Sequence, residues 1–99
     1  MPRKVFVTRV RPERREDYVD AHRKVPEDLL ARYGAEGMRS CEVWLRGDDL
    51  VMIIDAEDHG RIAAALAGDP VSDRWEAYVG EMKQGEWQEM RPVFEKVWR

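Results

Sequence analysis

The chain has 99 residues, of which 37% are charged and 43% are hydrophobic, and its formal net charge is -3. Because acidic and basic residues are interspersed, the composition argues against a nucleic-acid-binding surface. The single cysteine, Cys41, excludes an internal disulfide, and no apolar run approaches the ~20 residues that span a bilayer. We expect one domain over residues 1–99, in a cytoplasmic protein with no membrane or nucleic-acid partner. A core of this size gives modest stability, which favours a homo-oligomer.

The first third of the sequence predicts a strand and then a long helix. Residues 4–10 are rich in β-branched and aromatic side chains and stop before Pro12, as a strand would. From about residue 13 to residue 33, apolar side chains recur every three or four positions, which is typical of an amphipathic helix. Pro26 predicts a kink or a short break within it, and Gly34 predicts its end.

The middle of the sequence predicts a hairpin. Residues 40–45 and 50–56 are strand-like, and the Gly47-Asp48 step between them has the chemistry of a tight turn. We therefore expect these two strands to pair in antiparallel fashion.

The last third predicts two helices and a strand. Asp58 is placed to cap a short helix that runs to Leu66, and Gly68-Asp69-Pro70 ends it and begins a second helix that runs to about Met82. After a polar connector, residues 92–98 (PVFEKVW) predict a fourth strand.

The resulting order, β-α-β-β-α-α-β, predicts an α+β, ferredoxin-like fold with a four-stranded antiparallel sheet and its helices on one face. Large apolar residues occupy both phases of the strands: Val5, Phe6, Val7, Met52, Ile53 and Ile54. The second face therefore needs a cover, and we expect a homodimer, a dimeric α/β barrel in which a second copy of the chain supplies it.

Tyr18 and His22 are the strongest candidates for a functional site. They lie four residues apart, so a helix would place both side chains on one face. Histidine changes charge near neutral pH and tyrosine offers a ring and a hydroxyl, which suits proton transfer on a small polar ligand. From composition alone, a merely half-buried surface histidine is an equally good interpretation.

Other aromatic residues favour structural roles. Trp75 and Tyr78 form a possible platform for a sugar ring, but spacing alone favours core anchors, and a core role is also the simpler interpretation of Trp44. Trp87 and Trp98 suit either the core or a dimer contact.

Metal and nucleotide chemistry find little support in the sequence. His22 and His59 are far apart, no HxH, CxxC or GxGxxG spacing occurs, and Cys41 has no histidine nearby. We expect neither a metal nor a cofactor.

A set of residues along nearly the whole chain matches a known pattern: Arg3-Lys4-Val5-Phe6-Val7, Val10, Pro12, Tyr18, His22, Pro26-Glu27, Gly37, Leu45, Arg74-Trp75 and Val93-Phe94. In this order and spacing the chain resembles the L-rhamnose mutarotase family, small dimeric proteins that interconvert the anomers of a deoxy sugar. The resemblance implies that His22 is the proton donor and that Tyr18 and Trp75 contact the sugar, a monosaccharide.

Two positions depart from the family's pattern. Cys41 stands where the family usually has a sugar-binding tyrosine, and Glu76 stands where it often has a second tryptophan. Both are candidate substrate-binding residues. A lost aromatic wall and a gained hydrogen-bond acceptor favour a substrate other than L-rhamnose, such as L-fucose or a more polar sugar.

Three hypotheses follow. The chain is a sugar mutarotase with His22 as general acid/base, a cofactor-free monooxygenase on the same scaffold, or a binding module without turnover.

Overall fold

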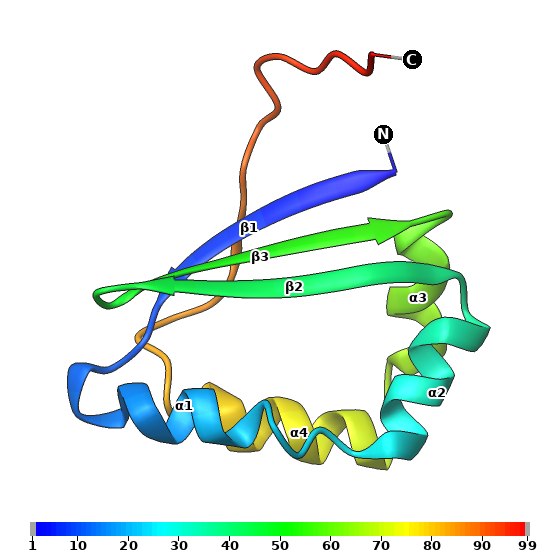
Figure 1. Cartoon of the computed structure of the whole chain (residues 1–99). Coiled ribbons are helices and arrows are strands. Elements are labelled where there is room, and N and C mark those ends of the chain that lie inside the picture. The colour runs from blue at the N-terminus through cyan, green and yellow to red at the C-terminus, as the bar shows by residue number, and fades with distance from the viewer. Residues whose placement is uncertain (1, 99) are drawn as a thin grey trace.

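A computed structural model of the chain describes residues 2–98 (Figure 1). Its elements, in order, are β1 (Arg3–Arg9), the 3-10 turn η1 (Pro12–Arg14), α1 (Arg15–Ala21), α2 (Glu27–Ala35), β2 (Met38–Arg46), β3 (Asp49–Ala56), α3 (His59–Leu66), α4 (Pro70–Gly80) and β4 (Gln88–Glu89).

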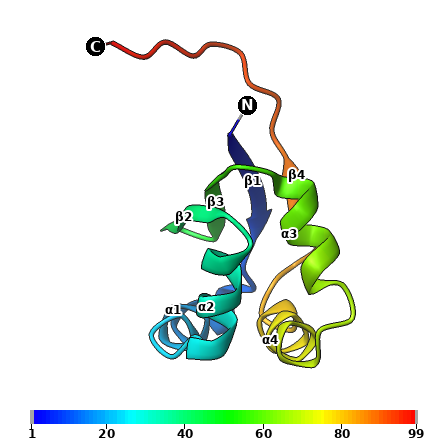
Figure 2. The same ribbon diagram turned by 90° about the vertical axis from the view of Figure 1, so that its right-hand side faces the viewer.

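The strands form one antiparallel sheet in the order β2-β3-β1-β4. All helices lie on one side of it, with α1 and α4 running side by side below the strands (Figures 1 and 2). This is the ferredoxin-like arrangement that the element order predicted. Among residues 2–98, no helix is long and apolar enough to cross a membrane.

The long helix predicted after the first strand is broken into α1 and α2, as Pro26 predicted. α1 ends at Ala21, the chain turns through residues 22–26, and α2 begins directly after Pro26, which has no amide hydrogen to offer the helix. The predicted end at Gly34 is wrong, because Gly34 lies in the last turn of α2. Gly37 is the residue with a left-handed backbone, at φ 96°, and it leads into β2.

The hairpin between β2 and β3 has a two-residue turn, as predicted. Gly47 has φ 58°, a conformation that glycine adopts without steric cost, and the flanking Arg46 and Asp49 are paired across the turn. The turn fixes the register of the whole hairpin. Leu45 is opposite Leu50, and Cys41 is opposite Ile54.

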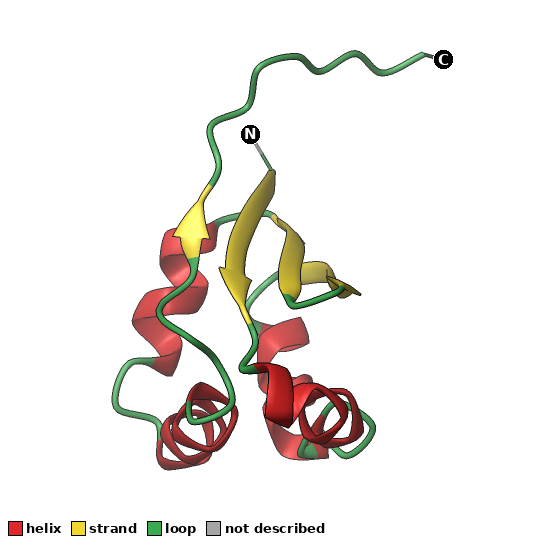
Figure 3. Cartoon of the chain, turned by 90° about the vertical axis from the view of Figure 1, so that its left-hand side faces the viewer, coloured by secondary structure: helices red, strands yellow, loops and turns green. Residues whose placement is uncertain are grey.

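The fourth strand is not where the sequence predicted it. β4 is the short Gln88–Glu89 segment, which pairs with Val7 and Phe6 of β1. Residues 92–98 form no strand and extend away from the rest of the chain as an arm (Figure 3). Val93 and Phe94 are 89% and 82% exposed on this arm. Residues 92–98 are rich in β-branched and aromatic side chains, but within residues 2–98 they pair with no strand.

Two hydrophobic clusters fill the space between the sheet and the helices. The first consists of Val10, Tyr18, Ala21, Leu50, Val79 and Met82. The second consists of Leu29, Ala56, Ile62 and Leu66. The half-buried Trp75 packs against both clusters and so connects them.

The other face of the sheet carries no helix. Residues directly opposite on neighbouring strands share a face, so Trp44, Val51 and Val7 lie together on the side away from the helices. Trp44 is 61% exposed there.

Candidate active site

α1 brings Tyr18 and His22 together. Tyr18 is 4% exposed within the first cluster. His22 directly follows the helix, yet its ring still lies over the Tyr18 face, with ring centroids 4.5 Å apart. The side-chain contact predicted from the four-residue spacing therefore forms.

A backbone contact determines which ring nitrogen of His22 is available. His22 Nδ1 lies 2.8 Å from the carbonyl oxygen of Tyr18. A carbonyl oxygen only accepts, so Nδ1 carries a hydrogen and donates it. In the neutral ring Nε2 then holds the lone pair, and it is the nitrogen left to take up or deliver a proton.

α4 supplies the third ring of the site. Asp69 caps this helix by accepting hydrogen bonds from the backbone N–H groups of Val71 and Ser72, and Pro70 occupies the first helical position. One turn further on, Trp75 meets the His22 ring edge to face, with centroids 5.2 Å apart. Since Trp75 also packs against both clusters, its position is fixed by the core.

Glu76 and Cys41 lie at the exposed side of this group. Cys41 shares the helix-facing side of the sheet with Val43 and Leu45, and both Cys41 and Glu76 remain exposed. Burial raises the pKa of Tyr18 above its ordinary value, and the acidic groups of Glu76 and Cys41 raise it further. Of the five residues proposed from the sequence, Tyr18, His22 and Trp75 are in ring contact, while Cys41 and Glu76 act electrostatically on Tyr18.

The structure adds two residues that the sequence did not single out. Tyr33 of α2 is half-buried, and burial together with Glu76 and Cys41 raises its pKa to about 12. Lys83, just beyond α4, is 5% exposed, and burial lowers its pKa while Glu76 and Glu86 act in the opposite direction. Tyr33 ends the apolar stripe that predicted the helix, whereas no pattern in the sequence marks Lys83.

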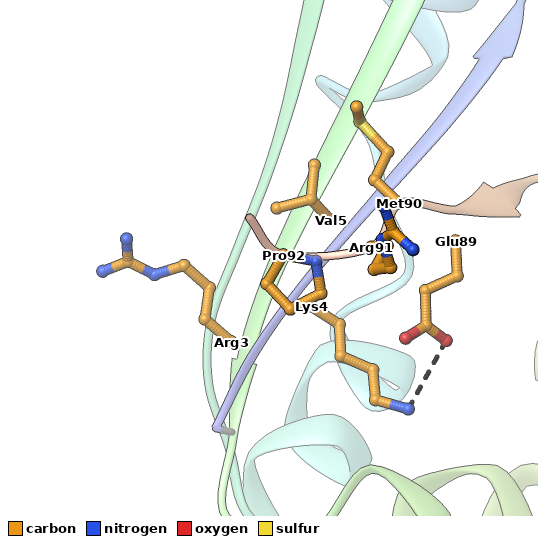
Figure 4. A pocket seen from close by; sticks show the side chains of 7 residues that line it. All are labelled: Arg3, Lys4, Val5, Glu89, Met90, Arg91 and Pro92. Carbon is orange, nitrogen blue, oxygen red and sulfur yellow. Dashed lines mark ion pairs between the residues drawn. The ribbon is translucent and has the colours of Figure 1, made fainter. Parts of the chain in front are cut away.

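Of two surface hollows, one lies beside this group and the other lies away from it, and His22 lines neither. One is bordered by Trp75, Tyr78, Ala21 and charged side chains of α1 and the turn after it. The other lies where the arm leaves the sheet and contains the Lys4–Glu89 ion pair at 3.5 Å (Figure 4). The second is formed by β1 and residues 89–92, away from the three rings.

Metal-binding side chains do not gather within residues 2–98, since no group of three or more histidine, cysteine, aspartate or glutamate residues there could hold an ion. The chemistry available at the three rings is proton transfer at His22 Nε2 and hydrogen bonding from neutral tyrosine hydroxyls.

Comparison with known proteins identifies the family. The family model described as L-rhamnose mutarotase matches residues 3–98. The chain belongs to the L-rhamnose mutarotase family. No curated protein sequence matches the chain.

Solved structures share the fold at low sequence identity. An L-rhamnose mutarotase from Formosa agariphila is 12% identical, with a TM-score of 0.82 over 98% of this chain and 100% of that one. Tetracenomycin F2 cyclase from Streptomyces glaucescens is 17% identical, with a TM-score of 0.73 over 98% of each chain. A putative antibiotic biosynthesis monooxygenase from Bordetella bronchiseptica is 13% identical, with a TM-score of 0.70 over 93% of this chain and 96% of that one. At these identities the comparisons establish the fold that the mutarotase family shares with other proteins.

Proposed function

We propose that this chain is a sugar mutarotase that interconverts the α and β anomers of a deoxyhexose, such as L-rhamnose or L-fucose, with His22 as general acid/base. One observation carries the proposal. The Nδ1 hydrogen of His22 is held by the Tyr18 carbonyl, so Nε2 is free for proton transfer between the rings of Tyr18 and Trp75. Membership of the mutarotase family supplies the reaction class.

The reaction needs proton transfer and no redox step. Neutral Nε2 takes up the proton of the anomeric hydroxyl, and the imidazolium so formed delivers a proton to the ring oxygen as the bond between the anomeric carbon and the ring oxygen breaks and the open-chain aldehyde forms. Rotation about the next carbon–carbon bond exposes the other carbonyl face. On reclosure the attacking hydroxyl gives its proton back to Nε2, which passes a proton to the carbonyl oxygen, and the other anomer forms. Imidazole suits this exchange because it both gives and accepts a proton near neutral pH.

Tyr18, Trp75, Cys41 and Glu76 are the proposed sugar-binding residues. The neutral Tyr18 hydroxyl donates to a sugar oxygen, and the Trp75 ring offers an apolar surface to the sugar's carbon–hydrogen face. The Glu76 carboxylate accepts from a hydroxyl, and the thiol of Cys41 leaves room where a larger side chain would narrow the site. Cys41 and Glu76 stand where the family usually or often has aromatic residues, and this difference favours a substrate other than L-rhamnose itself.

Replacing His22 with alanine tests the assignment. Anomer exchange of a panel of aldoses is measured by saturation-transfer NMR, and His22→Ala is expected to lower the catalysed rate by about two to four orders of magnitude. His59→Ala is the matched control, because His59 lies on α3 and its Nε2 contacts the Pro2 carbonyl.

A His22→Ala protein that is as active as the parent on its best sugar would contradict the role of His22. Oxygen consumption with phenolic compounds, in a protein without anomer exchange, would indicate a monooxygenase instead.

We also propose a homodimer formed through the open face of the sheet. Trp44, Val51 and Val7 give this face an apolar surface, and the arm adds the exposed Val93 and Phe94. A contact that buries the open face and the arm together removes apolar surface from water, which favours association.

A further inference from the structure

Trp75 and Tyr78 present two aromatic rings to the surface hollow that α1 and α4 form together. Their ring centroids are 6.2 Å apart, and Trp75 is the same ring that meets His22 edge to face. Trp75 is half-buried against both hydrophobic clusters, whereas Tyr78 is 52% exposed. The Tyr78 ring therefore keeps apolar surface in contact with water, beside a tryptophan that the core holds in place.

A small side chain leaves room for the hollow. Ala21, the last residue of α1, lines it and is also a buried member of the first cluster. The hollow is open to solvent and has a volume of about 630 Å³, within the range of roughly 300–1,000 Å³ that is usual for small-molecule sites. Its size suits a small organic molecule better than a single ion.

Charged side chains of both signs form the rim of the hollow. Arg14 forms an ion pair with Asp17 at 2.8 Å and Arg23 forms one with Asp20 at 2.8 Å, while Lys24 adds an ammonium group. Each pair sets a guanidinium, which only donates hydrogen bonds, next to a carboxylate, which only accepts them. All four of these side chains are at least 33% exposed, so their remaining donors and acceptors can reach a ligand.

This combination of groups indicates the class of ligand. Donors and acceptors that lie side by side match sugar hydroxyls, because each hydroxyl both donates and accepts, and aromatic rings match the carbon–hydrogen face of a sugar. A nucleic acid would favour a rim of cations without neighbouring carboxylates, and an apolar ligand would favour a lining with few charges. A saccharide uses both the rings and the rim.

We propose that the hollow between α1 and α4 is a second saccharide-binding site, in which a sugar ring stacks on Tyr78 and Trp75 and its hydroxyls bind the charged rim. His22 does not line the hollow, so this site holds a sugar without proton transfer. It shares the Trp75 ring with the proposed mutarotase site and is otherwise separate from it. The inference does not depend on the proposed reaction.

Fluorine NMR tests where the sugar binds. The chain has three tyrosines, so labelling with 3-fluorotyrosine gives three signals, and Tyr78→Phe assigns that of Tyr78. The probes are the methyl glycosides of L-rhamnose, L-fucose and D-glucose, whose anomeric carbon is locked and cannot exchange. At least one of them is expected to shift the Tyr78 signal saturably, because a stacked sugar changes the surroundings of the fluorine. A Tyr78 signal that none of the glycosides moves would overturn the inference.

Tyr78→Ala tests whether the ring holds the sugar. The Kd of the same glycoside is measured by saturation-transfer difference NMR and is expected to rise about tenfold, the effect of losing one aromatic contact. Tyr78→Phe keeps the ring and is expected to bind as the parent does. Phe94→Ala removes an equally exposed aromatic ring from the arm and is the control. A folded Tyr78→Ala protein that binds the glycoside as tightly as the parent would contradict the site.

Anomer exchange separates this site from the proposed reaction. Tyr78→Ala is expected to keep the exchange rate of the parent, and its loss would overturn the proposal of a separate site. A glycoside that shifts the Tyr18 signal and leaves that of Tyr78 in place would also overturn it, with the mutarotase function left standing. A shifted Tyr78 signal in a protein without anomer exchange would support the second site and contradict the reaction.

Discussion

Tyr18 and Tyr33 are both held in their neutral form by the same surroundings. Each is removed from water by the helices and the sheet, and each lies near the acidic groups of Glu76 and Cys41. A phenolate in this place would lose hydration and meet negative charge. Both hydroxyls therefore remain hydrogen-bond donors at any pH at which a sugar would be bound.

This arrangement predicts a loss of stability in alkali. The folded state holds its tyrosine protons up to about pH 12 at Tyr33, whereas an unfolded tyrosine loses its proton near pH 10. Between these values the folded state binds more protons, so the free energy of unfolding falls as pH rises. Urea unfolding at a series of pH values from 9 to about 12 measures the fall, and Tyr33→Phe is expected to lessen it.

Tyr78→Phe, which alters an exposed ring, is the control for this measurement. Identical pH profiles for the parent and Tyr33→Phe would contradict the account of Tyr33.

At the residue scale, the sequence predicts those side-chain contacts that the geometry of a single helix determines. The contact of Tyr18 and His22 follows from a spacing of four within α1, and it forms although His22 lies just beyond the helix end. Lys83 could not be predicted, because its burial depends on the bridge to Val10, far away along the chain. The hydrogen bond from His22 Nδ1 also depends on where α1 ends.

The start of α4 positions the site at the scale of the element. Asp69 is buried and does two things at once: it caps the helix and forms an ion pair with Arg32 of α2 at 2.5 Å. It therefore ties the helix that carries Trp75 and Glu76 to the helix that carries Tyr33.

Removing the Asp69 carboxylate should therefore lower the free energy of unfolding by more than the loss of a helix cap alone would. Asp69→Ala is expected to lower the free energy of unfolding by about 2–3 kcal/mol, about 1 for the cap and the rest for the broken pair with Arg32. Asp58→Ala removes the exposed cap of α3 and is expected to cost about 1 kcal/mol. Urea unfolding measures both, and equal losses would show that the Arg32 pair contributes nothing.

Turns, breaks and caps depend on nearby residues and could be predicted from the sequence. β4 depends on pairing with a distant strand and could not. The turn at Gly47, the break at Pro26, the cap at Asp58 and the helix start at Asp69-Pro70 each follow from one or two residue types. β4 has two residues and exists because Val7 and Phe6 lie opposite them. So short a segment has no period to detect.

At the scale of the whole molecule, the sheet has one covered face and one open face. The helices lie on one side of the sheet (Figures 1 and 3). Both hydrophobic clusters lie on that side, while Trp44 and its neighbours lie on the other. The arm leaves β4 and continues beyond the amino-terminal end of β1 (Figure 2). A face and an arm that are both apolar and both open favour contact with a second copy.

Association is tested by removing the arm or by charging the face. Deletion of residues 91–99, or Trp44→Glu, is expected to convert a dimer into a monomer, because each removes apolar surface from the proposed contact. Light scattering during size-exclusion chromatography measures the mass. Leu30→Glu, at an exposed apolar residue of α2, is the control and should stay dimeric. A monomeric parent protein would contradict the dimer.

The alternation of side chains along β2 has a consequence for how this fold diversifies. Cys41, Val43 and Leu45 face the helices, while Glu42 and Trp44 face away from them. Because the two sets point to opposite faces, substitutions that would alter the proposed ligand site and those that would alter the proposed dimer contact fall on different residues. Proteins as different as a mutarotase, a polyketide cyclase and a monooxygenase share this framework at 12–17% identity. A strand whose two sets of side chains face different surroundings can keep its backbone while the chemistry of one face is replaced.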